Sequence, residues 1–581
     1  MKTVKNFQPK LLAVAVLIGL CTLNSGAFAV TATSVASPPS LSWQTVVNNG
    51  DYIPTASCNP TTPTSPPCRK FNSYNQPSVN EKNLVVFRAR SKGGQGGEPV
   101  HGVYTRDMNK GSAAIVKILD RDTLVPAPNT ESATFIEPPS FPRIDMVSSM
   151  IATRGNHKPV FGYTLPDGSD TKVGTTGIYT NPFGSLITGV GKLGGVPEFS
   201  FLQVPEFPST TFEVFPGAPA VTQGSTIVFK GNYTVGIASK TGVYYRDLKK
   251  QAVAGGTQPV VLIANNTHTL IPGTTSTLFG STAPPSAVGK QAVFAGFDNE
   301  ENPTAGGIYL APLESYKLTK QPKLKTLVSI GSQVPSEPKN TPFNKLGEGV
   351  SFDGRYIAFW GAWGDANKKV RLYCREDGNK DLKAYCESTA SGSTEDLVNG
   401  GWYQEKDVPV NQGIFVHDLK SGKNVRIART GTGLADFSDF VYWNFSGKAP
   451  GVGEGGESDD DGELARWRSA SFMAVSSKVD DDNYYTAFKA RTAVTDGNPV
   501  DGIYLRKETE KSPLITVVKT GMSGILFDAE AIDTATNAML PVTEMGLERD
   551  GFRGNSLAIN VSMGTEEAGW AGVYLTRLPK H

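Results

Sequence analysis

The strongest candidate for chemistry in this sequence is an acidic run at residues 453–467, GEGGESDDDGELARW. Read from Glu457, the order Glu-x-Asp-x-Asp-Gly is the order in which calcium loops begin, because Ca²⁺ takes carboxylate and carbonyl oxygens as ligands. The predicted ligands are Glu457, Asp459, Asp461 and Glu463. The twelfth position is Arg468 in place of the glutamate that completes an EF-hand loop. Calcium is the one cofactor that the sequence suggests, and a solvated acidic loop is the alternative. Asp298–Glu301 and Asp480–Asp482 are similar acidic tips.

Histidine, a common general base and metal ligand, occurs at five positions: His101, His157, His268, His417 and His581. No pair has metal-ligand spacing, and no G-x-S-x-G elbow is present, so the sequence indicates neither a zinc protease nor an α/β-hydrolase. His101 and His417 flank or follow predicted strands from which they could reach a central channel, and hydrogen bonding in loops is the alternative. The catalytic residues, if the protein is an enzyme, stay unknown.

Aromatic side chains beside acidic and amide groups suit the recognition of a glycan or a protein. They gather in two long segments, residues 363–410 and 434–468. The candidate ligand-binding residues there are Trp402, Tyr403, Trp443 and Trp467. Long loops on a regular scaffold often carry function, and a structural flap over a sheet edge is the alternative.

Of the five cysteines, Cys21 lies in the N-terminal apolar run, and the other four stand in two close pairs, Cys58 with Cys68 and Cys374 with Cys386. Short intervening segments favour local pairing, and neither pair has the two-residue spacing or the nearby histidine of a zinc site. We therefore predict two disulfides, which form in oxidising compartments.

The elements that position these residues belong to an internal repeat. A Gly-aliphatic-aromatic signal occurs seven times, at Gly102, Gly177, Gly242, Gly307, Gly413, Gly502 and Gly572. Apolar runs such as NLVVFRAR, KPVFGYT and STIVFKGN precede it, and shorter runs such as QPSVN, GAPAVT and PPSAVG precede those. Downstream runs end in an aliphatic-Pro corner, as in LKTLVSIGSQVP. The glycine is either small where backbones crowd or adopts a positive φ as the chain leaves a hairpin.

Each unit is therefore predicted to be a meander of four strands. Seven such sheets predict an all-β fold, a seven-bladed β-propeller in which each sheet buries its faces on its neighbours. The alternative is a string of independent β-domains, whose units of about 70 residues would have marginal cores.

The two ends of the repeat complement each other. The last copy, GVYLTRLPKH, has no run after it, whereas SWQTVVNNGDYIPTASC near the front has the pattern of an outer strand with no unit before it. We expect Trp43–Pro54 to complete the sheet begun by Ser556–Leu578, so that an N-terminal strand closes the last blade. This closure would remove the exposed sheet edges of an open array.

Two motifs carry a family resemblance. VSFDGRYIAFWG, at Val350–Gly361, is similar to the S-x-D-G-x-x-I-A-F strand pair of TolB-type and WD-repeat-like propellers. The cycle of Gly-aliphatic-Tyr and Val-Pro resembles a poorly characterised group of exported bacterial β-propeller repeat proteins. The resemblance implies a fold and not a reaction.

The N-terminus has the pattern of a signal peptide. The basic segment MKTVKNFQPK and the apolar run LLAVAVLIGLC precede Ala27-Phe28-Ala29, which predicts cleavage after Ala29. The expected organisation is a signal peptide at 1–29, a disordered segment at 30–42 and the propeller at 43–581, in the periplasm or outside the cell. The 56 basic and 55 acidic residues balance, so no net charge selects nucleic acid, and no later segment is apolar enough to span a membrane.

These observations favour an exported binding or interaction module for a protein or glycan, engaged by the long loops of blades five and six. The alternative is a glycan-acting hydrolase or lyase with carboxylates in the central channel, where a glycosidase needs two carboxylates about 5–10 Å apart. The sequence leaves the oligomeric state open.

Overall fold

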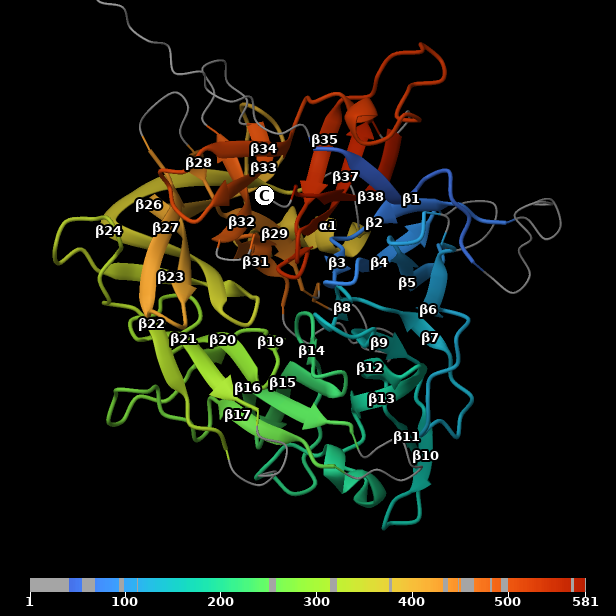
Figure 1. Cartoon of the computed structure of the whole chain (residues 1–581). Helices are drawn as coiled ribbons and strands as arrows, with labels where there is room; N and C mark the ends of the chain where they lie inside the picture. The colour runs from blue at the N-terminus through green and yellow to red at the C-terminus, as the bar shows by residue number, and fades with distance from the viewer. Residues whose placement is uncertain are drawn as a thin grey trace, which may run out of the picture. The chain divides into compact units, whose positions relative to one another are not determined.

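The structure is a computed structural model that describes most of the chain after residue 40. The described residues are 41–54, 68–92, 99–111, 113–249, 258–313, 321–375, 379–431, 437–447, 449–450, 464–480 (478–480 as backbone only), 483–492, 500–565 and 569–579. Leu41–His581 form one compact unit, and its described residues are nearly all β (Figure 1). Among them, seven antiparallel sheets of four or five strands follow one another along the chain. The predicted all-β class is confirmed.

The first four sheets use consecutive stretches of the chain. Sheet one contains β2 (Phe71–Tyr74), β3 (Ser78–Val79), β4 (Leu84–Ser91), β5 (His101–Asp107) and β6 (Val116–Asp120). Sheet two contains β7 (Phe135–Glu137), β8 (Arg143–Ile144), β9 (Ile151–His157), β12 (Thr176–Phe183) and β13 (Ser185–Gly191). Sheet three contains β14 (Ala220–Thr222), β15 (Thr226–Val235), β16 (Ala238–Asp247) and β17 (Val261–Asn265). Sheet four contains β18 (Ser281–Thr282), β19 (Ser286–Val288), β20 (Gln291–Phe297), β21 (Gly306–Pro312) and β22 (Lys325–Ser329).

The last three sheets carry the longer elements. Sheet five contains β23 (Phe343–Phe352), β24 (Tyr356–Tyr373), β25 (Thr394–Glu395), β26 (Trp402–Asp418) and β27 (Lys423–Arg429). Sheet six contains β28 (Phe437–Asp439), β31 (Met473–Asp480), β32 (Asn483–Thr492), β33 (Val500–Lys507) and β34 (Leu514–Lys519). Sheet seven contains β35 (Val542–Gly546), β36 (Phe552–Arg553), β37 (Ser556–Gly564), β38 (Gly569–Arg577) and β1 (Trp43–Asn48).

A few elements lie outside these sheets. Two ladders pair β10 (Phe161–Thr164) with β11 (Asp170–Val173) and β29 (Tyr442–Ser446) with β30 (Arg466–Ala470). The helices are α1 (Lys380–Cys386) and the 3₁₀ turns η1 (Pro197–Leu202), η2 (Thr389–Ser391) and η3 (Gly524–Leu526). None of the helices in the described part of the chain is long and apolar enough to cross a membrane.

The repeated Gly-aliphatic-aromatic signal lies on one strand of each sheet: β5, β12, β16, β21, β26, β33 and β38. We call these the third strands, because the two segments that begin each sheet, such as β2 and β3, share one position in it. A Cβ atom at Gly242 would lie 2.6 Å from the Tyr244 hydroxyl oxygen and 2.8 Å from the Ala264 carbonyl oxygen. The side chain two positions along a strand shares the same face, and here the tyrosine ring folds back over the glycine. None of the seven glycines has a positive φ. Crowding explains the glycine, and the alternative explanation through a positive φ is wrong.

Opposite each aliphatic-aromatic step, the outer strand contains a β-bulge in all seven sheets. In three places the bulged residue accepts a hydrogen bond from an arginine on the third strand of the next sheet. Arg106 donates to Val46 O at 2.7 Å, Arg246 to Gly189 O, and Arg506 to Ile427 O at 2.7 Å. At these three places the bulge therefore allows an arginine of one sheet to hydrogen-bond to the backbone of its neighbour.

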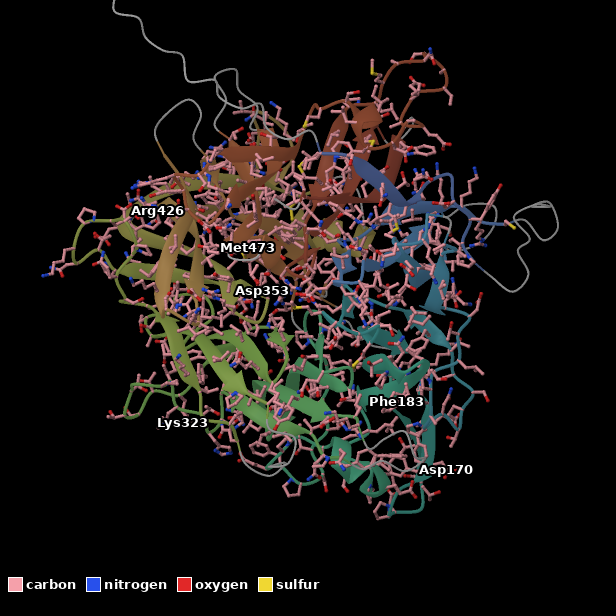
Figure 2. All side chains as sticks on the ribbon, viewed as in Figure 1. Asp170, Phe183, Lys323, Asp353, Arg426 and Met473 are labelled. Atoms are coloured by element: carbon pink, nitrogen blue, oxygen red, sulfur yellow. A yellow bond between two sulfur atoms is a disulfide. The ribbon has the colours of Figure 1, made fainter. Side chains whose placement is uncertain are left out.

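Hydrophobic clusters join the sheets in chain order. One cluster spans sheets one to three, and four others join three to four, four to five, five to six and six to seven. In a sixth cluster, Val46, Val573 and Leu575 of sheet seven pack with Val85 and Phe87 of sheet one. Each sheet therefore buries its faces against two neighbours, and the last sheet packs on the first. Figure 2 shows the side chains on the ribbon, in the view of Figure 1.

The strand nearest the N-terminus belongs to the last sheet. β1 pairs antiparallel with β38, with Trp43 opposite Thr576 and Asn48 opposite Gly572, and Figure 1 shows the blue strand beside the red one. Trp43 also packs on Phe527, with ring centroids 5.1 Å apart.

Sheet two differs from its sequence prediction. KPVFGYT was expected to be a second strand, but Phe161–Thr164 is β10 of a side ladder and the second strand is β9. The prediction was wrong because β9 buries polar side chains, including Arg154, Asn156 and His157, which hide the apolar pattern of a core strand.

Candidate functional site

The innermost strands of the seven sheets contact one another in a closed cycle: β3, β8, β14, β19, β23, β31, β36 and again β3. Each of them is interrupted or irregular part-way along. Prolines stand in the first four interruptions at Pro77, Pro139, Pro219 and Pro284, because proline cannot donate to a sheet ladder. In sheet six the interruption is the longest, at residues 440–472, and in sheet seven it spans residues 547–551.

Residues 547–553, which we call the axial segment, contact five other sheets. Val79 N donates to Asp550 O at 3.0 Å, and Arg549 donates to Pro284 O at 2.9 Å. Ser351 Oγ donates to Arg549 O at 2.7 Å, and Arg553 donates to Phe352 O at 2.9 Å and to Val475 O at 3.2 Å. These hydrogen bonds join the segment, which belongs to sheet seven, to sheets one, four, five and six, and Arg143 adds sheet two.

The axial segment also carries a buried charge cluster. Arg143 of β8 pairs with Glu548 and with Asp550, the latter at 2.7 Å, while Arg553 pairs with Asp550 and Arg549 approaches Glu548 at 3.3 Å. Burial alone would raise the pKa of Asp550, but Arg143 and Arg553 outweigh it and lower that pKa below its usual value. Burial and Arg143 lower the pKa of Arg549 to about 10. Both carboxylates are paired with arginines, an arrangement that suits structure rather than proton transfer.

The predicted calcium ligands Glu457, Asp459, Asp461 and Glu463 lie outside the described residues, so their coordination stays a prediction. In the acidic turn at Asp298–Glu301, Asp298 accepts hydrogen bonds from the backbone N–H groups of Thr304 and Ala305. Glu300 and Glu301 pair with Arg466 at 2.6 and 3.0 Å. Across the described parts of the chain, no group of three His, Cys, Asp or Glu side chains is placed to hold a metal ion.

The described histidines are held by local contacts. His157 Nδ1 donates to Lys158 O at 2.8 Å, while Nε2 accepts from the Tyr179 hydroxyl, and burial lowers the pKa of His157 to about 4. Both rings line a cavity of about 10 Å³, space for about one water molecule. His101 and His417 lie on the third strands β5 and β26, away from the innermost strands. His268 stacks on Phe207, and His581 lies outside the described residues.

The long segment of sheet five forms what we call the arm, residues 364–410. After an irregularity past Trp363, β24 and β26 continue as a two-stranded ribbon from Asn367 opposite Pro409 to Tyr373 opposite Tyr403. The predicted Cys374–Cys386 disulfide is confirmed, and it joins the end of β24 to α1. Cys68 is disulfide-bonded as well, but its predicted partner Cys58 lies outside the described residues. The arm is thus a covalently braced projection.

The arm ends in a turn at residues 396–401, which we call the tip. The Asp396 carboxylate accepts the N–H groups of Val398 and Asn399 at 3.0 Å, the Asn399 side-chain amide at 3.1 Å and the Tyr373 hydroxyl at 2.7 Å. Gly400 N also donates to Asp396 O at 2.8 Å. The hydrogen bonds from Tyr373 and Asn399 hold the pKa of Asp396 well below its usual range.

The side chains outside this turn are apolar. Leu397 and Val398 are 87% and 90% exposed, and Tyr373 beside them is 40% exposed. Arg371 lies over the Tyr403 ring, 4.7 Å from its centroid, and reaches Asp396 at 3.5 Å. A rigid polar interior therefore presents two adjacent aliphatic side chains to solvent. Neither residue was among the predicted binding residues, although DLVNGG combines an aspartate turn signal with two aliphatics.

The four predicted aromatic residues form two groups. Trp402 and Tyr403 stand on β26 beside the tip, and Tyr403 packs on Tyr373 with centroids 5.5 Å apart. Trp443 and Trp467 stand on β29 and β30, where Trp467 packs on Phe445 at 5.5 Å. The two insertions touch where Tyr385 of α1 meets Phe445 at 6.2 Å. All four predicted residues are half-buried.

Comparison with known proteins adds distant structural likenesses. No protein-family model and no curated protein matches the chain. The chain is similar to the β-propeller domain of the trilobed protease from Pyrococcus furiosus, at 9% identity and a TM-score of 0.31 over 87% of this chain and 94% of that one. It is similar to the α-L-arabinanase of Penicillium chrysogenum (8%, TM-score 0.28, covering 92% and 98%) and to an α-L-arabinofuranosidase of Podospora anserina (8%, 0.23, covering 62% and 89%). At these identities and scores, the matches assign no activity to this chain.

Proposed function

We propose that the protein is an exported interaction module: a seven-bladed β-propeller, closed by β1, whose arm binds a protein partner through the tip. The observation that carries the proposal is the turn built around Asp396, which holds Leu397 and Val398 in solvent. Fixing an apolar contact before binding lowers the entropy cost of association. Export is supported by the Cys374–Cys386 disulfide, since such bonds persist in oxidising compartments.

The closed ring is supported by the cycle of innermost strands and by the cluster that joins sheets seven and one. Its test is a charge placed in that junction. Val47→Asp puts a carboxylate at a fully buried position, whereas Gln44→Asp alters an exposed position of the same strand. We expect a large fall in the urea midpoint for Val47→Asp alone. Equal midpoints for the two variants would contradict closure by β1.

A protein partner fits the tip better than a glycan does. Aliphatic side chains such as Leu397 and Val398 gain from burial against another apolar surface and offer no hydrogen bonds to sugar hydroxyls. The rings of Trp402, Trp443 and Trp467, on which a sugar could stack, are half-buried. A glycan screen of the purified protein tests this alternative, and specific glycan binding would favour it over the protein partner.

Site-specific photo-crosslinking tests the proposal. A benzophenone amino acid replaces Val398 or, as the matched control, Ile237, a fully exposed aliphatic at the β15–β16 turn, in living source cells. We expect a discrete protein adduct from position 398, none from position 237, and loss of the adduct when Asp396→Ala is added. No adduct at 398, or the same adducts at 237, would contradict a docking role for the tip.

The hydrolase or lyase alternative gains no support from the axial segment, because arginines hold both of its carboxylates at Glu548 and Asp550. Calcium binding by Glu457, Asp459, Asp461 and Glu463 stays a separate proposal, which a calcium titration of the Tm tests.

A further inference from the structure

The tip contains an asparagine followed by a glycine, a pair that can lose ammonia without an enzyme. The Gly400 nitrogen, after losing its proton to water, bonds to Cγ of Asn399, the bond from Cγ to Nδ2 breaks, and ammonia leaves. Water then opens the resulting succinimide ring at one of its two carbonyls and leaves aspartate or isoaspartate. A following glycine favours this reaction because it has no side chain to crowd the ring.

The chain contains two such pairs, and their surroundings differ. At Asn399–Gly400 the side chain is exposed, and a Cβ on Gly400 would meet no atom within 4 Å, which leaves room for the ring. At Asn49–Gly50 the Asn49 side-chain oxygen is buried, and a Cβ on Gly50 would lie 3.2 Å from Glu530 and 3.6 Å from Trp570. The geometry therefore favours reaction at the tip.

Asp396 restrains both reacting groups in the tip. Its carboxylate holds the Asn399 side-chain amide at 3.1 Å, and its carbonyl oxygen accepts the Gly400 N–H at 2.8 Å. The Asn399 amide must leave the Asp396 carboxylate before Cγ can meet the Gly400 nitrogen. The rate in the folded protein is thus set by opening of the turn.

Reaction would also destroy the turn. Asn399 would change from a donor to Asp396 into a carboxylate beside an ionised carboxylate, and like charges at contact repel. Isoaspartate would additionally lengthen the backbone by one carbon and move Gly400 N away from Asp396 O. We propose that Asn399 is a deamidation site and that its conversion disrupts the tip turn, so that Leu397 and Val398 can no longer dock. The loss of docking rests on the proposed function, whereas the deamidation itself does not.

Peptide mass spectrometry of the full-length protein, held at mildly alkaline pH, tests the proposal. We expect the Asn399 peptide to convert progressively from amide to acid while the Asn49 peptide stays an amide, and both to convert in denaturant. Asp396→Ala should accelerate conversion at Asn399 and leave Asn49 unchanged. Conversion at Asn399 no faster than at Asn49 would overturn the site, and an unchanged rate in Asp396→Ala would overturn the restraint.

The product form is tested with Asn399→Asp, and Asn399→Gln serves as an uncharged control. Hydrogen exchange at the amides of Val398 and Asn399 reports the turn without any partner. We expect fast exchange in Asn399→Asp and slower exchange in Asn399→Gln, and equal rates would overturn the proposed disruption of the turn. If deamidation occurs but position 398 gives no crosslink in the unmodified protein, the proposed function fails and the site stands.

Discussion

The axial segment and the tip are both loops organised by an aspartate, yet they use it in opposite ways. Asp550 is held by Arg143 and Arg553, and its segment bonds to five other sheets. Asp396 is held mainly by backbone and side-chain donors of its own arm. The pKa of each carboxyl lies below its usual value, but the first depends on distant sheets and the second on local sequence. A change at the axis should therefore affect the whole fold, and a change at the tip should stay local.

The largest expected effect is at Arg143. Arg143→Met removes the fully buried cation that compensates Glu548 and Asp550, and breaking a buried pair from one side costs about 3 to 5 kcal/mol. Arg375→Met, which removes an exposed pair with Glu544, should cost less than about 1 kcal/mol. Urea denaturation measures both free energies of unfolding. Similar losses in the free energy of unfolding for the two variants would mean that the axial charge cluster does not stabilise the packing of the sheets.

The next effect depends on pH. His157 has a pKa of about 4 in the folded state, against about 6.5 in an unfolded chain, so the unfolded chain takes up a proton first as the pH falls. Stability should therefore fall by up to about 3 kcal/mol between pH 7 and pH 4. His157→Gln should flatten this dependence. His268→Gln, at an exposed ring, should leave it unchanged, and a profile insensitive to His157→Gln would rule out this origin.

Sterics within a sheet give an intermediate effect. Gly242→Ala places a methyl group against the Tyr244 hydroxyl and the Ala264 carbonyl, and such overpacking costs about 1 to 3 kcal/mol. Gly111→Ala adds a methyl group with no atom within 4 Å and should change stability by less than about 0.5 kcal/mol. Thermal unfolding of the two variants side by side provides the measurement, and a neutral Gly242→Ala would remove crowding as the reason for the repeated glycine.

The smallest effect on stability is expected at the tip. Asp396→Ala should change the free energy of unfolding by less than about 1 kcal/mol, since Leu397 and Val398 bury almost nothing. The same variant should speed hydrogen exchange at Val398 and Asn399. A cooperative loss of stability comparable with that of Arg143→Met would end the distinction between the two regions.

The sequence predicted most strands because the repeat is local. The third-strand signal, several innermost strands such as QPSVN and PPSAVG, and the Cys374–Cys386 bridge all depend on residues close together in the chain. A second periodic signal went unnoticed. Six phenylalanines begin β2, β7, β23 and β28 or precede β14 and β18, in the segments that lead to the innermost strands. They pack on the third-strand aromatic ring at 4.7–5.3 Å, at Phe71, Phe135, Phe212, Phe279, Phe343 and Phe437. They were missed because these strands are short and their neighbouring residues are polar.

The candidate sites were less predictable. The axial cluster joins Arg143 to residues more than 400 positions away, and no local pattern signals such a partner. Trp402 and Tyr403 indicated the arm as a candidate site, but what distinguishes the end of the arm is the exposure of its aliphatic side chains and not its aromatic content. Leu397 and Val398 are ordinary core residues by type, and only the Asp396 turn leaves them outside.

The pairing of β1 with β38 has a consequence for biogenesis. β1 is synthesised long before its partner, so its hydrogen-bonding edge must wait unpaired while more than 500 further residues are made. Contacts of such sequence separation form late and slow the final folding step. Until then, the unpaired strands at both ends can pair with other chains and aggregate. A chaperone that shields Trp43–Asn48 during this interval would therefore reduce aggregation.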